Sequence, residues 1–98
     1  MMLGKVAGGA VRLAPIGGDG ILGLCEGIET GLAAMTACPE LPVWATLSTQ
    51  HLEQVQLPGA ARIVLILADH DGSGAGLRSA EATAARLRAE GRQVVIVA

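Results

Sequence analysis

Ile63-Val64-Leu65-Ile66-Leu67-Ala68 runs directly into Asp69-His70-Asp71 and then into Gly72-Ser73-Gly74-Ala75-Gly76. A continuous aliphatic run of this length is typical of a strand buried in the middle of a parallel sheet. In such sheets, ligands bind just beyond the carboxyl ends of the strands. The sequence therefore predicts a buried strand that carries two carboxylates, Asp69 and Asp71, to a candidate binding edge.

On both sides of this stretch, strand and helix patterns alternate. The expected strands are 21–25, 43–46, 62–68 and 93–97, and the expected helices are 28–37, 49–55 and 75–90. Strands that alternate with helices form crossover units, so the order predicts an α/β fold with about four parallel strands flanked by helices. Gly91 follows the last helix, where a left-handed cap is common.

A third acid, Glu26, follows the first strand just as Asp69 and Asp71 follow the third. Parallel strands bring their carboxyl ends to one edge, and neighbouring strands lie about 4.8 Å apart. The three carboxylates converge if the first and third strands are neighbours, which puts the second strand on the far side of the first. The predicted strand order is therefore 2-1-3-4, with the topological switch point between the first and third strands.

Three clustered carboxylates favour a bound cation. Two like charges about 4 Å apart repel by roughly 1 kcal/mol in water and by about 4 kcal/mol at an effective dielectric constant of about 20. One acid must therefore hold a proton, or a cation must lie among them. Oxygen ligands suit Mg²⁺ or Mn²⁺, which typically engage substrate phosphates. A helix cap or a turn explains one of Asp69 and Asp71, but not readily both together with Glu26.

Composition limits the classes of function. The 98 residues fit one small domain, with residues 1–20 as a glycine-rich lead-in containing a short strand at 10–13 and residues 21–98 as the domain itself. The formal net charge of −2 gives no general attraction to nucleic acid or to an anionic membrane. Two cysteines are too few for a secreted disulfide framework, and no apolar run reaches membrane-spanning length. We expect a cytoplasmic protein without a membrane partner.

Two motifs resemble those of the Toprim domain: Leu24-Cys25-Glu26-Gly27-Ile28-Glu29-Thr30, and Leu65 to Asp71 with its glycine tail. Their order and spacing are most similar to the primase-type Toprim modules of phages and mobile elements, over about residues 20–97. The resemblance implies a Rossmann-like fold and a DNA primase-like role in DNA replication, namely Mg²⁺-dependent nucleotidyl transfer on nucleic acid. It implies that Glu26 is the general acid or base, close to the metal, and that Asp69 and Asp71 are metal ligands.

The resemblance has gaps. Bacterial replicative primases carry another acid four residues after the motif glutamate, whereas this chain has Thr30 there, with Glu29 as the nearest acid. Such primases also use a second catalytic subdomain and usually a zinc-binding domain. Nucleic acid, nucleotides and other domains of a primase or helicase-primase protein are therefore the expected partners, and activity is expected to need those domains. Weaker candidates for substrate or phosphate contact are Gly27, Glu29, His70, Gly74 and Arg78.

Two other functions stay open. The first is a metal-binding but non-catalytic Toprim scaffold or nucleic-acid-binding module, as in RecR-type repair proteins. The second is a phosphatase similar to haloacid dehalogenases, with Asp69 as its nucleophile. That class needs a later lysine, yet the chain's lysine is Lys5. Those phosphatases also carry the motif on their first strand, whereas this chain carries it on the third expected strand.

Other polar residues have simpler interpretations. The spacing of the cysteines and histidines includes no close pair of zinc ligands, which favours buried thiols and loop histidines. These residues are Cys25, Cys38, His51 and His70. Trp44, in the second strand, predicts a core residue. Arg86, Arg88 and Arg92 predict a solvated helical face, whereas Arg78 lies one turn from the acidic loop, where it can meet a phosphate.

Overall fold

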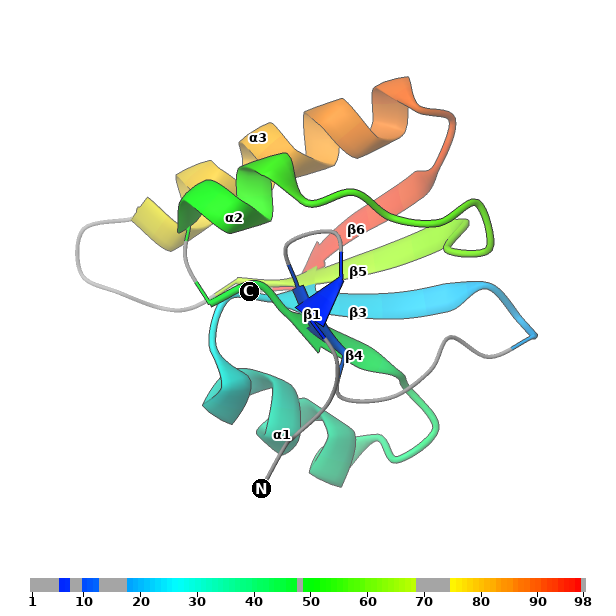
Figure 1. Cartoon of the computed structure of the whole chain (residues 1–98), viewed down its shortest axis with the longest axis vertical. Coiled ribbons are helices and arrows are strands. Elements are labelled where there is room, and N and C mark those ends of the chain that lie inside the picture. The colour runs from blue at the N-terminus through cyan, green and yellow to red at the C-terminus, as the bar shows by residue number, and fades with distance from the viewer. Residues whose placement is uncertain (1–5, 8–9, 13–17, 48, 69–74, 98) are drawn as a thin grey trace.

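The computed structural model describes residues 6–7, 10–12, 18–47, 49–68 and 75–97 (Figure 1). Within these ranges six strands form one sheet, in the order β1-β2-β4-β3-β5-β6. The strands are β1 (Val6–Ala7), β2 (Ala10–Arg12), β3 (Ile21–Cys25), β4 (Val43–Ala45), β5 (Ile63–Leu67) and β6 (Gln93–Val97). The helices are α1 (Ile28–Ala37), α2 (Thr49–Gln54) and α3 (Ala75–Ala89).

The four strands from β3 to β6 confirm the predicted α/β fold and its 2-1-3-4 order. β3 pairs in parallel with β4 on one side and with β5 on the other, and β6 pairs in parallel with β5. β3 is buried from Leu22 to Cys25, because it is a central strand with helices over both faces. The predicted left-handed cap is also confirmed, since Gly91 has a φ of 89°.

Two short strands extend the sheet beyond β4. β2 pairs antiparallel with β4, with Val11 opposite Ala45, and β1 pairs antiparallel with β2. The short strand expected at 10–13 is therefore present as Ala10–Arg12, and it lies in the same sheet as the parallel strands. β1 has no counterpart among the predicted strands.

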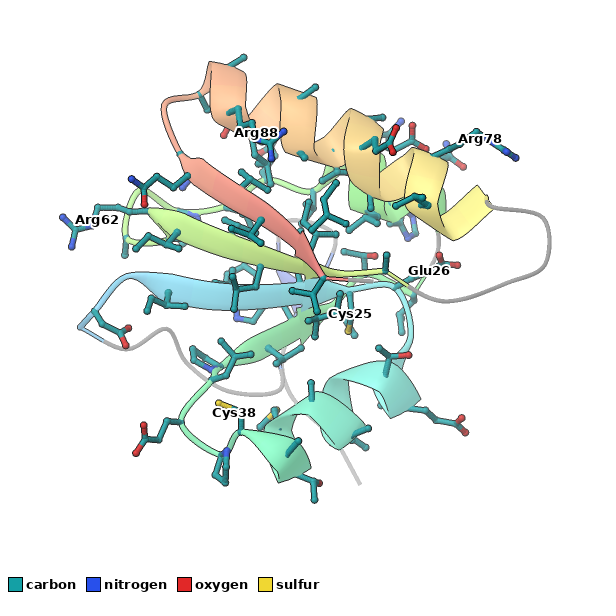
Figure 2. All side chains as sticks on the ribbon, turned by 180° about the vertical axis from the view of Figure 1, so that it is seen from behind. Cys25, Glu26, Cys38, Arg62, Arg78 and Arg88 are labelled. Carbon is teal, nitrogen blue, oxygen red and sulfur yellow. The ribbon has the colours of Figure 1, made fainter. Side chains whose placement is uncertain are left out.

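Helices cover the two faces of the sheet unequally (Figures 1 and 2). α1 packs on β3 and β4 on one face, whereas α3 packs on β5 and β6 on the other and also contacts α2. The larger core lies under α2 and α3 and includes Leu22, Trp44, Ile66 and Leu87. Trp44 is 1% exposed, which confirms the prediction of a core residue. In the described part of the chain, no helix is both long enough and apolar enough to cross a bilayer.

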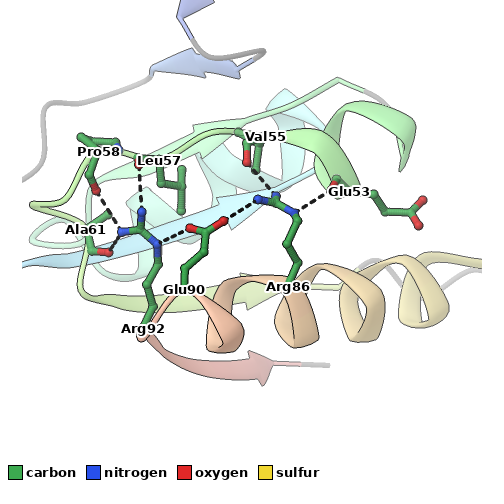
Figure 3. A network of polar contacts seen from close by, with 8 residues as sticks. All are labelled: Glu53, Val55, Leu57, Pro58, Ala61, Arg86, Glu90 and Arg92. Carbon is green, nitrogen blue, oxygen red and sulfur yellow. Dashed lines mark hydrogen bonds and ion pairs between the residues drawn. The ribbon is translucent and has the colours of Figure 1, made fainter.

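Arg86 in the last turn of α3 and Arg92 just before β6 hold the segment that leads from α2 into β5 (Figure 3). Arg92 donates to the carbonyl oxygens of Leu57 at 2.8 Å and Pro58 at 2.9 Å, and also to that of Ala61. Its side chain is 12% exposed. The Pro58 carbonyl also accepts from the Ala61 N–H at 3.1 Å. The carbonyls of Leu57 and Ala61 lie outside any strand or helix, and Arg92 supplies a donor to them.

Arg86 makes a second set of such contacts. It donates to the carbonyl oxygens of Glu53 at 2.9 Å and Val55 at 2.6 Å. Glu90 joins the two arginines, with ion-pair distances of 3.1 Å to each. The prediction of a solvated face is therefore wrong for Arg86 and Arg92, because the segment after α2 lies against that side of α3. Arg88 is exposed, but it also donates to a backbone carbonyl, that of Val94.

Candidate functional site

Glu26 lies at the carboxyl edge of the parallel strands. β3 and β5 are in register from Ile21 opposite Ile63 to Cys25 opposite Leu67. Glu26 therefore leaves the sheet level with Ala68, the residue that precedes Asp69 in the sequence. Figure 2 shows the Glu26 side chain just past the end of β3, on the side of the sheet that carries α3.

The other predicted ligands lie outside the described residues. These are Asp69 and Asp71, together with His70 and Gly74. The convergence of Glu26 with both aspartates therefore stays a prediction. Within the described ranges, no three histidine, cysteine, aspartate or glutamate side chains are grouped so that they could hold a metal ion.

The backbone around Glu26 is held from both sides. On the β4 side, the Thr46 N–H donates to the Cys25 carbonyl at 2.9 Å, and the Leu47 N–H donates to the Glu26 carbonyl at 2.6 Å. The Thr46 hydroxyl also donates to the Cys25 carbonyl, at 3.3 Å. On the α1 side, the Gly27 carbonyl accepts from the Cys25 thiol at 3.2 Å and from the Gly31 N–H at 3.1 Å.

Gly27 and Glu29 begin the helix that follows Glu26. Gly27 is the N-cap of α1, with φ −100° and ψ 146°, and makes no side-chain cap. A Cβ atom at this position would meet only the Thr30 hydroxyl oxygen, at 3.9 Å, so the backbone does not require glycine here. Glu29 is exposed in the first turn of α1, where the helix dipole favours an acid.

Arg78 lies in the first turn of α3 and is exposed. In Figure 2 its side chain extends outward from the helix and does not point toward Glu26. Arg78 is close to residues 69–74 in the sequence, but its side chain is not directed at Glu26 in the structure. Contact between Arg78 and a phosphate stays a prediction.

The cysteines and His51 differ in part from their predicted environments. Cys25 is buried as expected, but Cys38 is exposed at the end of α1. His51 lies in α2 and not in a loop, with its Nδ1 3.3 Å from the Thr46 carbonyl oxygen. The prediction of a buried thiol is therefore wrong for Cys38, because the end of α1 leaves it open to solvent. For His51 the loop interpretation is wrong, whereas the helix predicted at 49–55 includes it.

Sequence reasoning missed Leu47, which donates to the Glu26 carbonyl, and Thr46, which donates to the preceding carbonyl of Cys25. Leu47 has a φ of 74° and is the one non-glycine residue with positive φ in the described ranges. A residue other than glycine held in this region costs on the order of 1–3 kcal/mol, and such strain clusters at functional sites. Neither glycine nor asparagine marks this turn, so the sequence carries no signal for it.

Comparison with known proteins gives one match. A model of the Toprim domain family matches residues 21–98, from the first residue of β3 onward. The matched range includes Glu26 and both aspartates, Asp69 and Asp71. No curated protein and no solved structure gives a significant match to the chain.

Proposed function

Since the chain belongs to the Toprim domain family, we propose that it is the catalytic module of a DNA primase-like protein of a phage or mobile element. Toprim domains typically bind a divalent metal and act in association with nucleic acid. The proposed activity is nucleotidyl transfer, in which a nucleotide is added to a growing strand during DNA replication. The proposed partners are nucleic acid, nucleotides, and the other domains of a primase or helicase-primase protein.

The observation that carries this proposal is the place of Glu26 at the carboxyl edge of the sheet, in register with Ala68. Among the described acids, Glu26 is the one that directly follows the carboxyl end of a parallel strand. The order β4-β3-β5-β6 puts the switch point between β3 and β5, and ligands of open α/β sheets bind there. The acids of the two motifs are thus carried by neighbouring strands.

The residue types fit a divalent metal. Carboxylate oxygens are the ligands that Mg²⁺ and Mn²⁺ prefer. We assign Asp69, Asp71 and Glu26 as the residues that would hold the ion. When bound, a divalent ion would neutralise phosphate charge and stabilise the charge that develops during phosphoryl transfer.

The chain's own side chains have separate proposed roles. Glu26 acts as a general base that takes the proton of an attacking hydroxyl group, or as the acid that protonates a leaving oxygen. Gly27 and Gly74 present backbone that can approach the phosphates closely. Arg78 and His70 are proposed to contact phosphate, and Glu29 is proposed to contact the substrate.

The test is divalent-ion binding followed by turnover. We expect Glu26→Gln and Asp69→Asn each to weaken Mn²⁺ binding by at least about 10-fold in a titration, because each removes charge from the ion site. Glu81→Gln is the matched control, since Glu81 is an exposed acid on α3. Both site variants should also abolish primer synthesis by the parent protein.

Three other outcomes would count against this function. Unchanged ion binding and activity in both site variants would refute the metal site. Ion binding without any turnover in the intact parent protein would indicate the scaffold or nucleic-acid-binding alternative. A phosphate ester trapped on Asp69 with a small phosphorylated substrate would support the phosphatase alternative.

A further inference from the structure

We propose that the turn after β4, formed by Thr46 and Leu47, is a positioning element for Glu26. The inference rests on the proposed function of Glu26 and adds two residues to that site. Neither is proposed to touch substrate. Both act by fixing the backbone from which the Glu26 side chain projects.

The first support is the hydrogen-bond pattern. Two consecutive N–H groups, of Thr46 and Leu47, donate to the two consecutive carbonyls of Cys25 and Glu26. In a regular strand, consecutive N–H groups point to opposite sides, so this pattern is not a continuation of the β3–β4 ladder. The second bond is an additional contact, made after β4 has ended, and it falls on Glu26.

The second support is the strained backbone at Leu47. Its φ of 74° is unfavourable for leucine, and its side chain is 54% exposed. Burial of the side chain therefore does not account for the conformation. Strain at an exposed residue that bonds a candidate catalytic residue points to a functional constraint and not to packing.

The third support is that the turn is itself anchored. Thr46 is 1% exposed, and its hydroxyl donates to the same Cys25 carbonyl that its N–H contacts. Its carbonyl oxygen lies 3.3 Å from the Nδ1 of His51 in α2. A positioning residue must be fixed by its own neighbours to hold another group in place, and Thr46 meets this condition.

The opposite side of Glu26 is fixed as well. The Gly27 carbonyl accepts from the Cys25 thiol and from the first turn of α1. The peptide groups before and after Glu26 accept from Thr46 and Leu47, and the next one along the chain is held through the Gly27 carbonyl. The direction of the Glu26 Cα–Cβ bond is therefore set before any ligand arrives. Such preorganisation removes the need to order the backbone at the moment of binding.

The test compares variants of Leu47 in the 98-residue chain by Mn²⁺ titration and thermal unfolding. Leu47→Pro removes the N–H donor and fixes φ near −65°, so we expect Mn²⁺ to bind about 10-fold more weakly, as for other residues that orient a metal ligand. Leu47→Gly keeps the donor and adopts positive φ without strain, so Mn²⁺ affinity should match that of the wild type. Leu47→Val keeps the donor but disfavours the left-handed conformation, so its affinity should fall between the two.

Two further variants separate positioning from general destabilisation. Arg86→Ala removes contacts to Glu53 and Val55, away from Glu26, and should lower the unfolding temperature without changing Mn²⁺ affinity. Glu26→Gln shows whether the Glu26 carboxylate is itself needed for Mn²⁺ binding.

If Glu26→Gln weakens binding but Leu47→Val and every folded Leu47→Pro sample bind as the wild type, the positioning role is refuted and the proposed function stands. If Glu26→Gln also binds as the wild type, the proposed function fails, and the positioning role fails with it. Equal loss of affinity in Arg86→Ala would reduce the Leu47 effect to stability and would overturn the inference.

Discussion

Cys25 of β3 and Leu67 of β5 are paired residues of neighbouring parallel strands. The same level continues into β6, where Leu67 lies opposite Val97, and the Ala68 N–H donates to the Val97 carbonyl at 2.9 Å. The chain is therefore held by the sheet up to the residue before Asp69. Both acidic motifs therefore start from an edge that the sheet holds in place.

Glu29 should contribute less to ion binding than Glu26 does. It is exposed on the first turn of α1, whereas Glu26 lies at the end of the strand itself. We expect Glu29→Gln to change Mn²⁺ affinity by less than about 3-fold, the effect of an exposed charge that solvent and salt screen. A loss equal to that of Glu26→Gln in the same titration would place Glu29 among the ligands.

Arg92→Ala should be the most destabilising of the arginine substitutions. It leaves the carbonyls of Leu57, Pro58 and Ala61 without this donor, and we expect a loss of about 3 kcal/mol in the free energy of unfolding. Arg88→Ala is the matched control: its exposed side chain bonds one carbonyl, so its loss should be about 1 kcal/mol. Urea unfolding measures both, and equal losses would show that the three contacts of Arg92 stabilise the chain no more than the one contact of Arg88 does.

Trp44 should report on folding without any label. It is the chain's only aromatic residue and is 1% exposed. We expect blue-shifted emission and weak quenching by acrylamide in the folded chain, both lost on unfolding, because burial removes the indole from water. Folded-state emission that equals that of the urea-unfolded chain would contradict a buried Trp44.

The two thiols should react at very different rates. Cys38 is exposed, whereas Cys25 is buried and its thiol donates a hydrogen bond to the Gly27 carbonyl. A thiol-specific reagent should therefore modify one cysteine rapidly in the native chain and the second only as the chain unfolds. Mass spectrometry of the native reaction should find the label on Cys38, and early label on Cys25 would show that the β3 edge opens readily.

The parallel core of the fold was predictable because each of its elements carries its own signal. The aliphatic runs of β3 and β5 mark central strands. Gly91 marks the end of α3, because glycine adopts the positive φ of a left-handed cap without strain. The strand order was predictable from the acids alone, since Glu26 meets the motif of β5 only if these strands are neighbours. β1 was not predictable, because a two-residue strand between glycines has no periodicity and exists only through its pairing with β2.

The surroundings of Glu26 were harder to predict than its place. A left-handed residue is usually signalled by glycine or asparagine, and Leu47 gives no such signal. Helical spacing likewise puts Arg86 on the outside of α3, but it does not reveal that the carbonyls of Glu53 and Val55, at the end of α2 and just after it, lie within reach of Arg86. Both features depend on how distant segments meet in space.

The Arg92 contacts and Glu26 lie at opposite ends of the parallel strands. Arg92 and Ala61 precede β6 and β5, whereas Glu26 and Ala68 follow β3 and β5. The contacts that stabilise the chain before β5 and the proposed ion site are therefore separated by the length of the strands. Evolution or protein engineering could therefore change thermal stability at one end of the sheet without changing the proposed site at the other.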